Sequence, residues 1–271
     1  MKPLLYAALA AYVVAAIHSV LAFVNKRRAA DRVTTWALGA GFVAHTLVII
    51  ADWINDGHFP LLHLPETILF LAWTLVVVYA AALYRYGTRA MGVFTIPLVC
   101  VLVLASNFMR ERADLTAGHV TGGSAAWLFP VHTTLLIFAY AALFVAFTAS
   151  VMYLLMEREL RLKTFGAVFH RLPSLATVDD VGSGAAGAGF TLLTLGLVTG
   201  VVWSSARTGR VWHNDPVEMF ALLTWVLYLA LLHYRTQWRG RKAAWLGVAG
   251  GALVLCTFAG AVLLGGYHAF R

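Results

Sequence analysis

Long apolar blocks alternate with short polar or charged segments along the whole chain. Many of these blocks approach or exceed the roughly 18–20 residues that an α-helix needs to cross a bilayer. The pattern predicts an all-α fold, a polytopic membrane bundle of about eight transmembrane helices forming one domain over residues 1–271. The expected spans are Leu4–Phe23, Val33–Asp52, Leu64–Tyr84, Met91–Met109, Val131–Met156, Ala186–Ser204, Val217–Tyr234 and Ala243–Tyr267.

The composition supports membrane embedding and excludes a soluble protein. Hydrophobic residues make up 61% of the chain and charged residues 12%, whereas a soluble domain carries about 25% charged residues. The mean hydropathy is +0.79. The first apolar block has no basic segment before it and no A-x-A-like exit, so we interpret it as an uncleaved helix rather than a signal peptide.

The distribution of basic residues predicts the orientation in the membrane. Most of the 20 Lys and Arg residues fall in the first, third, fifth and seventh loops. The positive-inside rule places these loops in the cytoplasm and both termini on the outer, periplasmic side. We therefore expect a multi-pass protein of the bacterial inner membrane. Its net charge of +8 then reflects topology and contact with anionic lipids of the bilayer, and no nucleic-acid partner is expected.

The predicted cytoplasmic segment from Met156 to Ala185 differs from a simple connector. It contains "ERELRLK" and "FHRLPSLATVDDV", in which charged residues of both signs mix with spaced Leu, Phe and Val. Such a pattern is typical of a helix that lies along the membrane interface. We predict an interfacial helix between the fifth and sixth spans.

Histidine is the main residue type available to hold a metal or cofactor. Cys100 and Cys256 both lie inside apolar blocks, which leaves no disulfide framework and no C-x-x-C motif. Of the ten His residues, we interpret His58, His63 and His119 as loop residues and His170 as a surface residue, and His213 matches no motif. The remaining candidates are His18, His45, His132, His233 and His268.

The loop between the sixth and seventh predicted helices combines aromatic and basic residues. It reads "VVWSSARTGRVWHNDPVEMF" and contains Trp203 and Trp212 with Arg207 and Arg210. A haem needs imidazole ligands, a flat apolar floor and cations for its propionates, and Arg can bind a carboxylate with two parallel hydrogen bonds. The same residues are also typical of ordinary anchors at a bilayer surface. Composition and spacing leave both interpretations open.

At these residues the chain resembles the cytochrome c assembly proteins of the CcsA, CcmC and HemX type, whose external loop is rich in tryptophan. The resemblance rests on "GRVWHNDPVEMFALLTWVLYLALLHYR", which keeps Asp215, Pro216, Glu218 and His233 of the family pattern. Further segments match in the expected order: "GHFPLLHLPETILFLAW", "PSLATVDDVGSGAAGAGFTLLTLGLVTGVVW", "QWRGRKAAWLGVAGGALVL" and "GGYHAF". The resemblance extends over most of the chain from about Gly57 onward.

The resemblance implies the ligands of a haem. By position, His132 in "PVHTTLLIFAYA" and His268 match the two external His residues that bind haem iron in the family. His233 matches a His of a second, membrane-embedded site. Its partner on this chain is open: depth in the membrane favours His18, whereas the family's pattern in the second helix favours His45.

The loop also departs from the family pattern. Thr208 and Asn214 stand where the family has tryptophans, and Val217 replaces a lysine. The aromatic floor is therefore thinner, which places the chain toward the HemX-like branch, although His268 is typical of CcsA. Asp215 and Glu218 either orient a ligand or form a capping box at the start of a helix. The capping box is favoured, because Pro216 directly follows Asp215 and proline is common at the first position of a helix.

Two functions follow from the resemblance. In the first, the protein holds or exports haem b at the outer face for cytochrome c biogenesis, with apocytochrome c and a CcsB-like membrane protein as partners. In the second, it is a HemX-like regulator or accessory of haem biosynthesis that acts through its cytoplasmic loop. A b-type electron-transfer subunit is the weakest alternative, because His132 has no in-register partner within its helix. The chain has no thiol at the outer face, so a reactive Cys must come from the apocytochrome.

Overall fold

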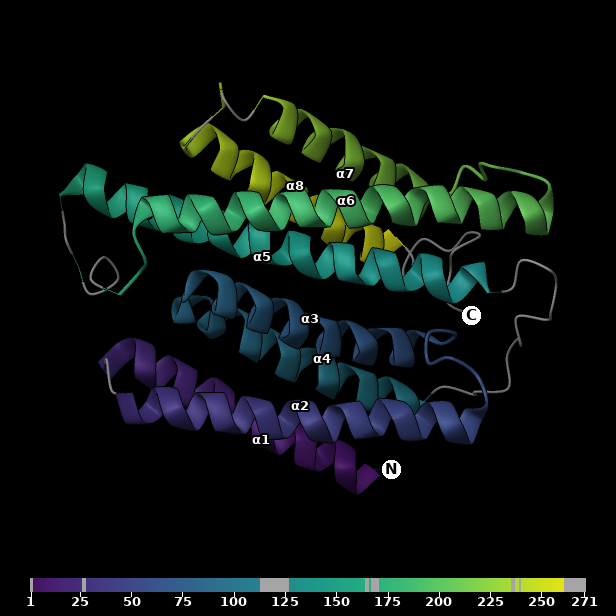
Figure 1. Cartoon of the computed structure of the whole chain (residues 1–271), viewed down its shortest axis with the longest axis horizontal. Coiled ribbons are helices and arrows are strands. Elements are labelled where there is room, and N and C mark those ends of the chain that lie inside the picture. The colour runs from purple at the N-terminus through teal and green to yellow at the C-terminus, as the bar shows by residue number, and fades with distance from the viewer. Residues whose placement is uncertain are drawn as a thin grey trace. The chain divides into compact units, whose positions relative to one another are not determined.

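The computed structural model describes residues 2–25, 28–112, 127–163, 166, 171–234, 237–238 and 240–260. All regular structure in these ranges is helical (Figure 1), which confirms the predicted all-α class. The chain divides into two compact units, Met1–Ala117 and Gly118–Arg271, and each is considered by itself. The helices are α1 (Lys2–Asn25), α2 (Arg28–Asp56), α3 (Leu64–Tyr86), the short 3-10 helix η1 (Arg89–Met91), α4 (Gly92–Arg112), α5 (Leu128–Leu162), α6 (Leu175–Thr208), α7 (Pro216–His233) and α8 (Arg241–Ala259).

The protein is a multi-pass membrane protein. Seven of the described helices, α1 to α7, are long and apolar enough to cross a bilayer. Helix α8 covers the first part of the predicted eighth span, and the end of that span lies outside the described residues. Apolar run length alone located these helices well, because a lipid-exposed segment must satisfy its backbone hydrogen bonds internally.

The segment between the fifth and sixth spans differs from the prediction. Helix α5 continues to Leu162, and α6 begins at Leu175 rather than at Ala186. The described part of the predicted interfacial helix therefore prolongs these two helices, and that prediction is wrong for residues 175–185. The reason is local: the Ser174 hydroxyl accepts a hydrogen bond from the backbone N–H of Thr177 and caps α6 at this earlier start.

Aromatic side chains join α2 to α3 in the first unit. The Trp73 ring stacks on Phe42 and on Phe70, with centroid separations of 5.4 and 5.6 Å. The Trp73 indole N–H donates to Thr46 Oγ1 at 2.9 Å. Phe59, in the connection before α3, packs edge-on against both Trp53 and Phe70, so this connection is anchored to the aromatic cluster.

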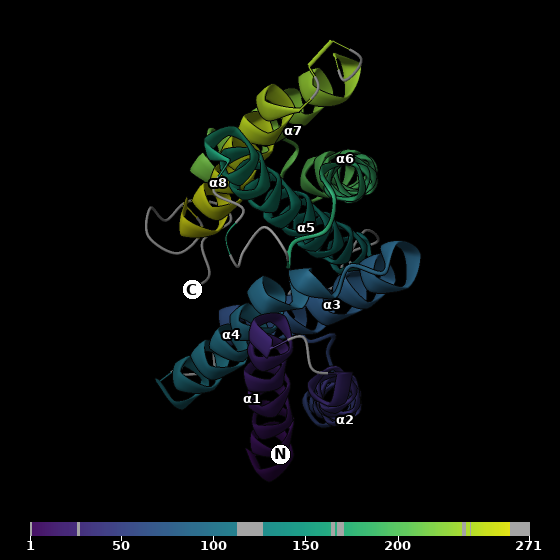
Figure 2. The same ribbon diagram turned by 90° about the vertical axis from the view of Figure 1, so that its left-hand side faces the viewer.

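Glycines allow helices α5 and α6 to approach closely in the second unit. The two helices run antiparallel side by side (Figures 1 and 2). Gly182, Gly189 and Gly196 of α6 recur every seven residues and face α5. A Cβ atom at Gly189 would lie 2.5 Å from Leu143 Cδ2, and one at Gly196 would lie 2.6 Å from Leu136 Cδ2. Small residues at such spacing are typical of close helix pairs in membranes.

Helix α8 packs against its neighbours by the same means. A Cβ atom at Gly250 would lie 2.6 Å from Tyr228 of α7, and one at Gly251 would lie 2.5 Å from Phe147 of α5. Both large rings therefore rest on backbone that carries no side chain. The apolar core of the unit lies between these helices, around residues such as Leu143, Leu193 and Tyr228.

The glycine contacts predict a difference between two substitutions on α6. Gly189→Ala should destabilise the protein by about 1–3 kcal/mol, because the added methyl group overlaps the buried Leu143 side chain. Gly187→Ala is the matched control, since no atom lies within 4 Å of its added Cβ, and it should be neutral or stabilise the helix by about 0.5–1 kcal/mol. Thermal unfolding of detergent-solubilised protein, followed by tryptophan fluorescence, measures both. Equal melting temperatures for the two variants would contradict the proposed packing.

Candidate functional site at the ends of helices α5 and α6

His132 lies in the second turn of α5 and its side chain is buried, with 8% exposed. Its ring Nδ1 is 2.7 Å from the backbone carbonyl oxygen of Gly196 on α6. A carbonyl oxygen can only accept, so Nδ1 carries the proton and donates it. In the neutral ring, Nε2 then carries the lone pair that a metal ion needs. Metal-binding histidines are typically held in this way by a hydrogen bond from the other ring nitrogen.

A second glycine provides the space that the imidazole occupies. A Cβ atom at Gly200 would lie 2.6 Å from Nδ1 and 3.3 Å from Nε2 of His132. The ring therefore packs directly on the backbone of α6. Gly196 supplies the acceptor, and Gly200, one turn later, supplies the room.

Aromatic residues and a cation surround the imidazole. The Trp203 ring, of which 6% is exposed, lies nearly parallel to the His132 ring, with a centroid separation of 6.4 Å and an interplanar angle of 19°. Phe129 contacts Trp203 at 5.2 Å between ring centroids. The guanidinium carbon of Arg207 lies 5.3 Å from the centre of the Trp203 ring, in cation–π contact. Helices α5 and α6 thus form an apolar wall with a positive charge at its exposed edge.

The loop after α6 is held by His213. The His213 Nδ1–H donates to Glu218 Oε1 at 3.2 Å, and the His213 backbone N–H donates to Glu218 Oε2 at 2.8 Å. The other ring nitrogen, Nε2, lies 3.1 Å from Thr208 Oγ1. One imidazole therefore links the end of α6 to the start of α7.

The residues that replace the family's loop tryptophans have structural roles. Thr208 contacts His213, as above, and its hydroxyl donates to the Ser204 carbonyl at 2.9 Å. Asn214 Oδ1 accepts a hydrogen bond of 2.8 Å from the indole N–H of Trp212. Asn214 also adopts a left-handed backbone with φ +54°, which Asn tolerates better than most residues. The thinner aromatic floor is therefore accompanied by a polar network that orders the loop.

Trp212 and Arg210 lie further out than Trp203. The Trp212 side chain is 42% exposed, and Arg210 is exposed while its backbone carbonyl accepts from the Ser204 hydroxyl at 3.0 Å. Asp215 is buried and caps α7: its Oδ1 accepts from the Val217 N–H at 2.8 Å. Glu218 completes the capping box, which confirms the predicted capping role.

Of the four remaining predicted histidines, the structure describes His18, His45 and His233. His268 lies outside the described residues. His233 ends α7 with an exposed side chain that contacts the Tyr234 ring at 4.8 Å between centroids. His45 is fully buried in α2, with Nδ1 3.2 Å from the Tyr12 hydroxyl. His18 is partly exposed and donates to the Val14 carbonyl of its own helix at 2.9 Å, which favours a structural role. His45 and His233 belong to different units, so their pairing stays a prediction.

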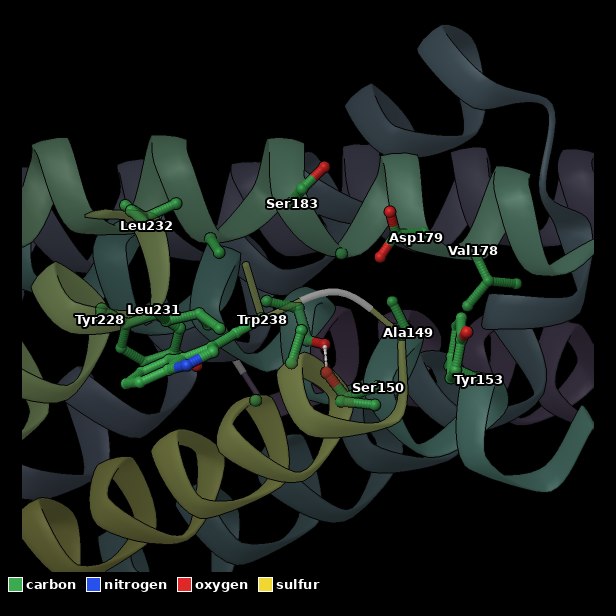
Figure 3. Close-up of a pocket in the computed structure, with 17 residues that line it drawn as sticks. Ala149, Ser150, Tyr153, Val178, Asp179, Ser183, Tyr228, Leu231, Leu232 and Trp238 are labelled. Carbon is green, nitrogen blue, oxygen red and sulfur yellow. Dashed lines mark hydrogen bonds between the residues drawn. The ribbon is translucent and has the colours of Figure 1, made fainter. Parts of the chain in front are cut away.

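A pocket occupies the other end of the second unit (Figure 3). Its volume is only about 50 Å³, and helices α5 to α8 together with Trp238 and Gly240 line it. Ala146, a lining residue on α5, lies about four turns or 21 Å along the helix from His132. Asp179 and Ser183 of α6 contribute its polar lining, and the Ser150 hydroxyl donates to the Ala146 carbonyl at 2.8 Å. The pocket is therefore separate from the His132 site.

Sequence reasoning missed four contributors to the His132 site and its loop: Phe129, Gly196, Gly200 and His213. The Gly196-x-x-x-Gly200 spacing just before Trp203 was a usable signal, because it marks where another helix comes close. His213 had no comparable signal, since its partners become visible only once the loop is folded.

Known proteins match this chain over most of its length. The family model described as Cytochrome C assembly protein matches residues 61–268. Proteins named "Cytochrome c biogenesis protein CcsA" are similar in sequence. The one from Synechococcus elongatus is 31% identical over 81% of this chain and 81% of the relative, and the one from Chlorella vulgaris is 30% identical over 86% and 84%.

A solved structure has the same fold. The protein titled "Cytochrome c Heme Lyase CcmF" matches with a TM-score of 0.65 and 19% sequence identity. The match covers 95% of this chain but only 46% of that one, so this chain spans about half the length of the lyase. Since the family model covers more than half of the chain and includes the whole His132 site, the chain belongs to the cytochrome c assembly protein family.

Proposed function

We propose that this protein handles haem for cytochrome c maturation, with His132 as one ligand of the haem iron. The observation that carries the proposal is the hydrogen bond from His132 Nδ1 to the Gly196 carbonyl, which makes Nε2 the metal-binding nitrogen. The names of the matched relatives, cytochrome c biogenesis proteins, support the same function. Haem is the cargo here, and the protein binds and presents it.

The surroundings of His132 fit a haem. Imidazole is a common axial ligand of haem iron, and the macrocycle packs well against flat apolar and aromatic side chains. Trp203 and Phe129 provide such a surface beside the imidazole. Arg207, at the exposed edge, suits a propionate carboxylate, which its planar guanidinium can bind with two hydrogen bonds.

The second ligand is proposed from the family resemblance. His268, which lies outside the described residues, matches the family's other external histidine and is proposed as the second ligand of the iron. Noncovalent bis-His ligation corresponds to haem b, and both described cysteines belong to helices, Cys100 to α4 and Cys256 to α8. We propose apocytochrome c as the source of the thiols that receive the haem, and a CcsB-like membrane protein as a further partner.

The location of the site follows from the charge distribution. The positive-inside rule puts the start of α5 and the end of α6 on the outer side of a bacterial inner membrane.

Removal of the proposed ligand should remove the haem, and a free ligand should restore it. His132→Gly should lower the haem bound per protein about tenfold or more, because one axial ligand is lost. Added imidazole should recover the absorption spectrum by filling the vacated space. Soret absorbance relative to protein, measured after haem-replete expression, checks this. His18→Ala is the control and should keep its haem, while an unchanged spectrum in His132→Gly would refute the assignment.

The glycine beneath the imidazole gives an independent prediction. Gly200→Ala should weaken haem binding although it removes no ligand, because the added methyl group overlaps the His132 ring and displaces Nε2. Haem titration monitored in the Soret region should show a weaker affinity, with a changed spectrum at saturation. Gly187→Ala, on the same helix with open space around its added Cβ, should bind like the wild type. Identical titrations for all three proteins would show that the position of the ring does not matter.

A further inference from the structure

Two histidines and a carboxylate converge at the start of α3 in the first unit. His58 and His63 belong to the connection between α2 and α3, and Glu66 lies in the first turn of α3. One potential ligand atom from each residue lies within 4.8 Å of the others. The sequence alone indicated only two unrelated loop histidines. We propose that His58, His63 and Glu66 form a binding site for a divalent transition metal ion such as Zn²⁺, a site that does not rest on the proposed handling of haem.

The carboxylate of this cluster is held in place. Glu66 is buried, and its Oε2 accepts hydrogen bonds from the backbone N–H groups of Leu62 at 3.1 Å and His63 at 3.3 Å. Both bonds use the same oxygen, and an ionised carboxylate offers about four acceptor positions on its two oxygens. Glu66 can therefore cap the helix and bind a metal ion at the same time.

The first histidine is oriented for metal binding. His58 Nδ1 lies 3.2 Å from the carbonyl oxygen of Phe59, which can only accept, so Nδ1 carries the proton and Nε2 the lone pair. The His63 ring lies beside it, with a centroid separation of 6.0 Å and an interplanar angle of 68°. Both rings are partly buried, which leaves a route for an ion to enter.

The backbone that carries the three residues is anchored. Phe59 packs between Trp53 and Phe70, and the fully buried Leu61 follows it. On the α3 side, the Ser106 hydroxyl donates to the Pro65 carbonyl at 2.7 Å. A site on such a fixed backbone requires only small side-chain rotations to close around an ion. Tetrahedral Zn²⁺ places its ligand atoms about 3.4 Å apart, given Zn–N distances of about 2.0–2.1 Å.

The donor set determines which ion the cluster suits. Imidazole nitrogens favour Zn²⁺, Cu²⁺, Ni²⁺ and Fe²⁺, whereas Ca²⁺ and Mg²⁺ are bound by oxygen atoms alone. Helix capping accounts for Glu66 and for the His63 side chain, which faces the Glu66 backbone N–H in the capping box of α3. It does not account for the second imidazole, His58, beside the same carboxylate. Three protein ligands leave one coordination position for water or an exchangeable group, as in zinc sites that are not purely structural.

The test is metal titration of the full chain in detergent, purified without a polyhistidine tag. Zn²⁺ should bind at one equivalent, measured by competition with a chromophoric chelator. His58→Ala and His63→Ala should each weaken binding about tenfold or more. Glu66→Gln should also weaken it, yet keep the helix cap, because Gln serves in a capping box as well. His18→Ala, a histidine of the same unit outside the cluster, is the matched control and should bind like the wild type.

A spectroscopic measurement identifies the ligands directly. With one equivalent of Cu²⁺, the electron paramagnetic resonance spectrum should show coupling to two imidazole nitrogens in the wild type and to one in His63→Ala. Zn²⁺ affinity that is unchanged in the His58→Ala/His63→Ala double variant would overturn the proposal. Loss of the haem Soret band in that variant, with Zn²⁺ binding intact, would also overturn it and assign the cluster to haem instead. Loss of Zn²⁺ binding with normal haem content would establish a separate metal site.

Discussion

The close contact between α5 and α6 is the constraint on which the candidate haem site depends. Leucine and lipid are similarly apolar, so helices in a bilayer gain little from burying apolar side chains and associate instead through close packing and hydrogen bonds between them. The glycines of α6 permit that packing, and the bond from His132 to the Gly196 carbonyl uses the short distance it creates. Without this approach, the imidazole would lack both its acceptor and the space it occupies.

Polar side chains order the loop after α6. Where the family places further tryptophans, this chain has Thr208 and Asn214. Thr208 Oγ1 accepts a hydrogen bond from the Arg210 backbone N–H, and Asn214 Oδ1 accepts one from the Trp212 indole N–H. His213 and Glu218 then connect the loop to the first turn of α7, where Asp215 caps the helix. A loop held by polar contacts presents less aromatic surface, and Trp203, packed beside His132, becomes the main aromatic wall of the site.

The His132 site and the cluster of His58, His63 and Glu66 differ in chemistry. His132 stands beside aromatic rings and a cation, which suits a large flat anionic molecule with a central iron. His58 and His63 stand beside a buried carboxylate, which suits a small bare cation, since its negative charge offsets the charge of the ion. The neighbours of each imidazole are therefore the basis for the ligand proposed for it.

The sequence by itself determined the features that depend on near neighbours. Apolar run length located the helices, and the Asp-Pro-x-Glu pattern indicated the cap of α7, because each is decided within a few turns of chain. The orientation expected from charge stays a prediction. Tertiary structure alone decided which nitrogen of His132 carries the proton, since its partner lies 64 residues away. It also decided that His58, His63 and Glu66 converge, because the folded connection brings them together. Glycine spacing can mark where two helices approach, but it does not say which side chains meet there, whereas membrane crossing and helix capping leave local patterns of their own.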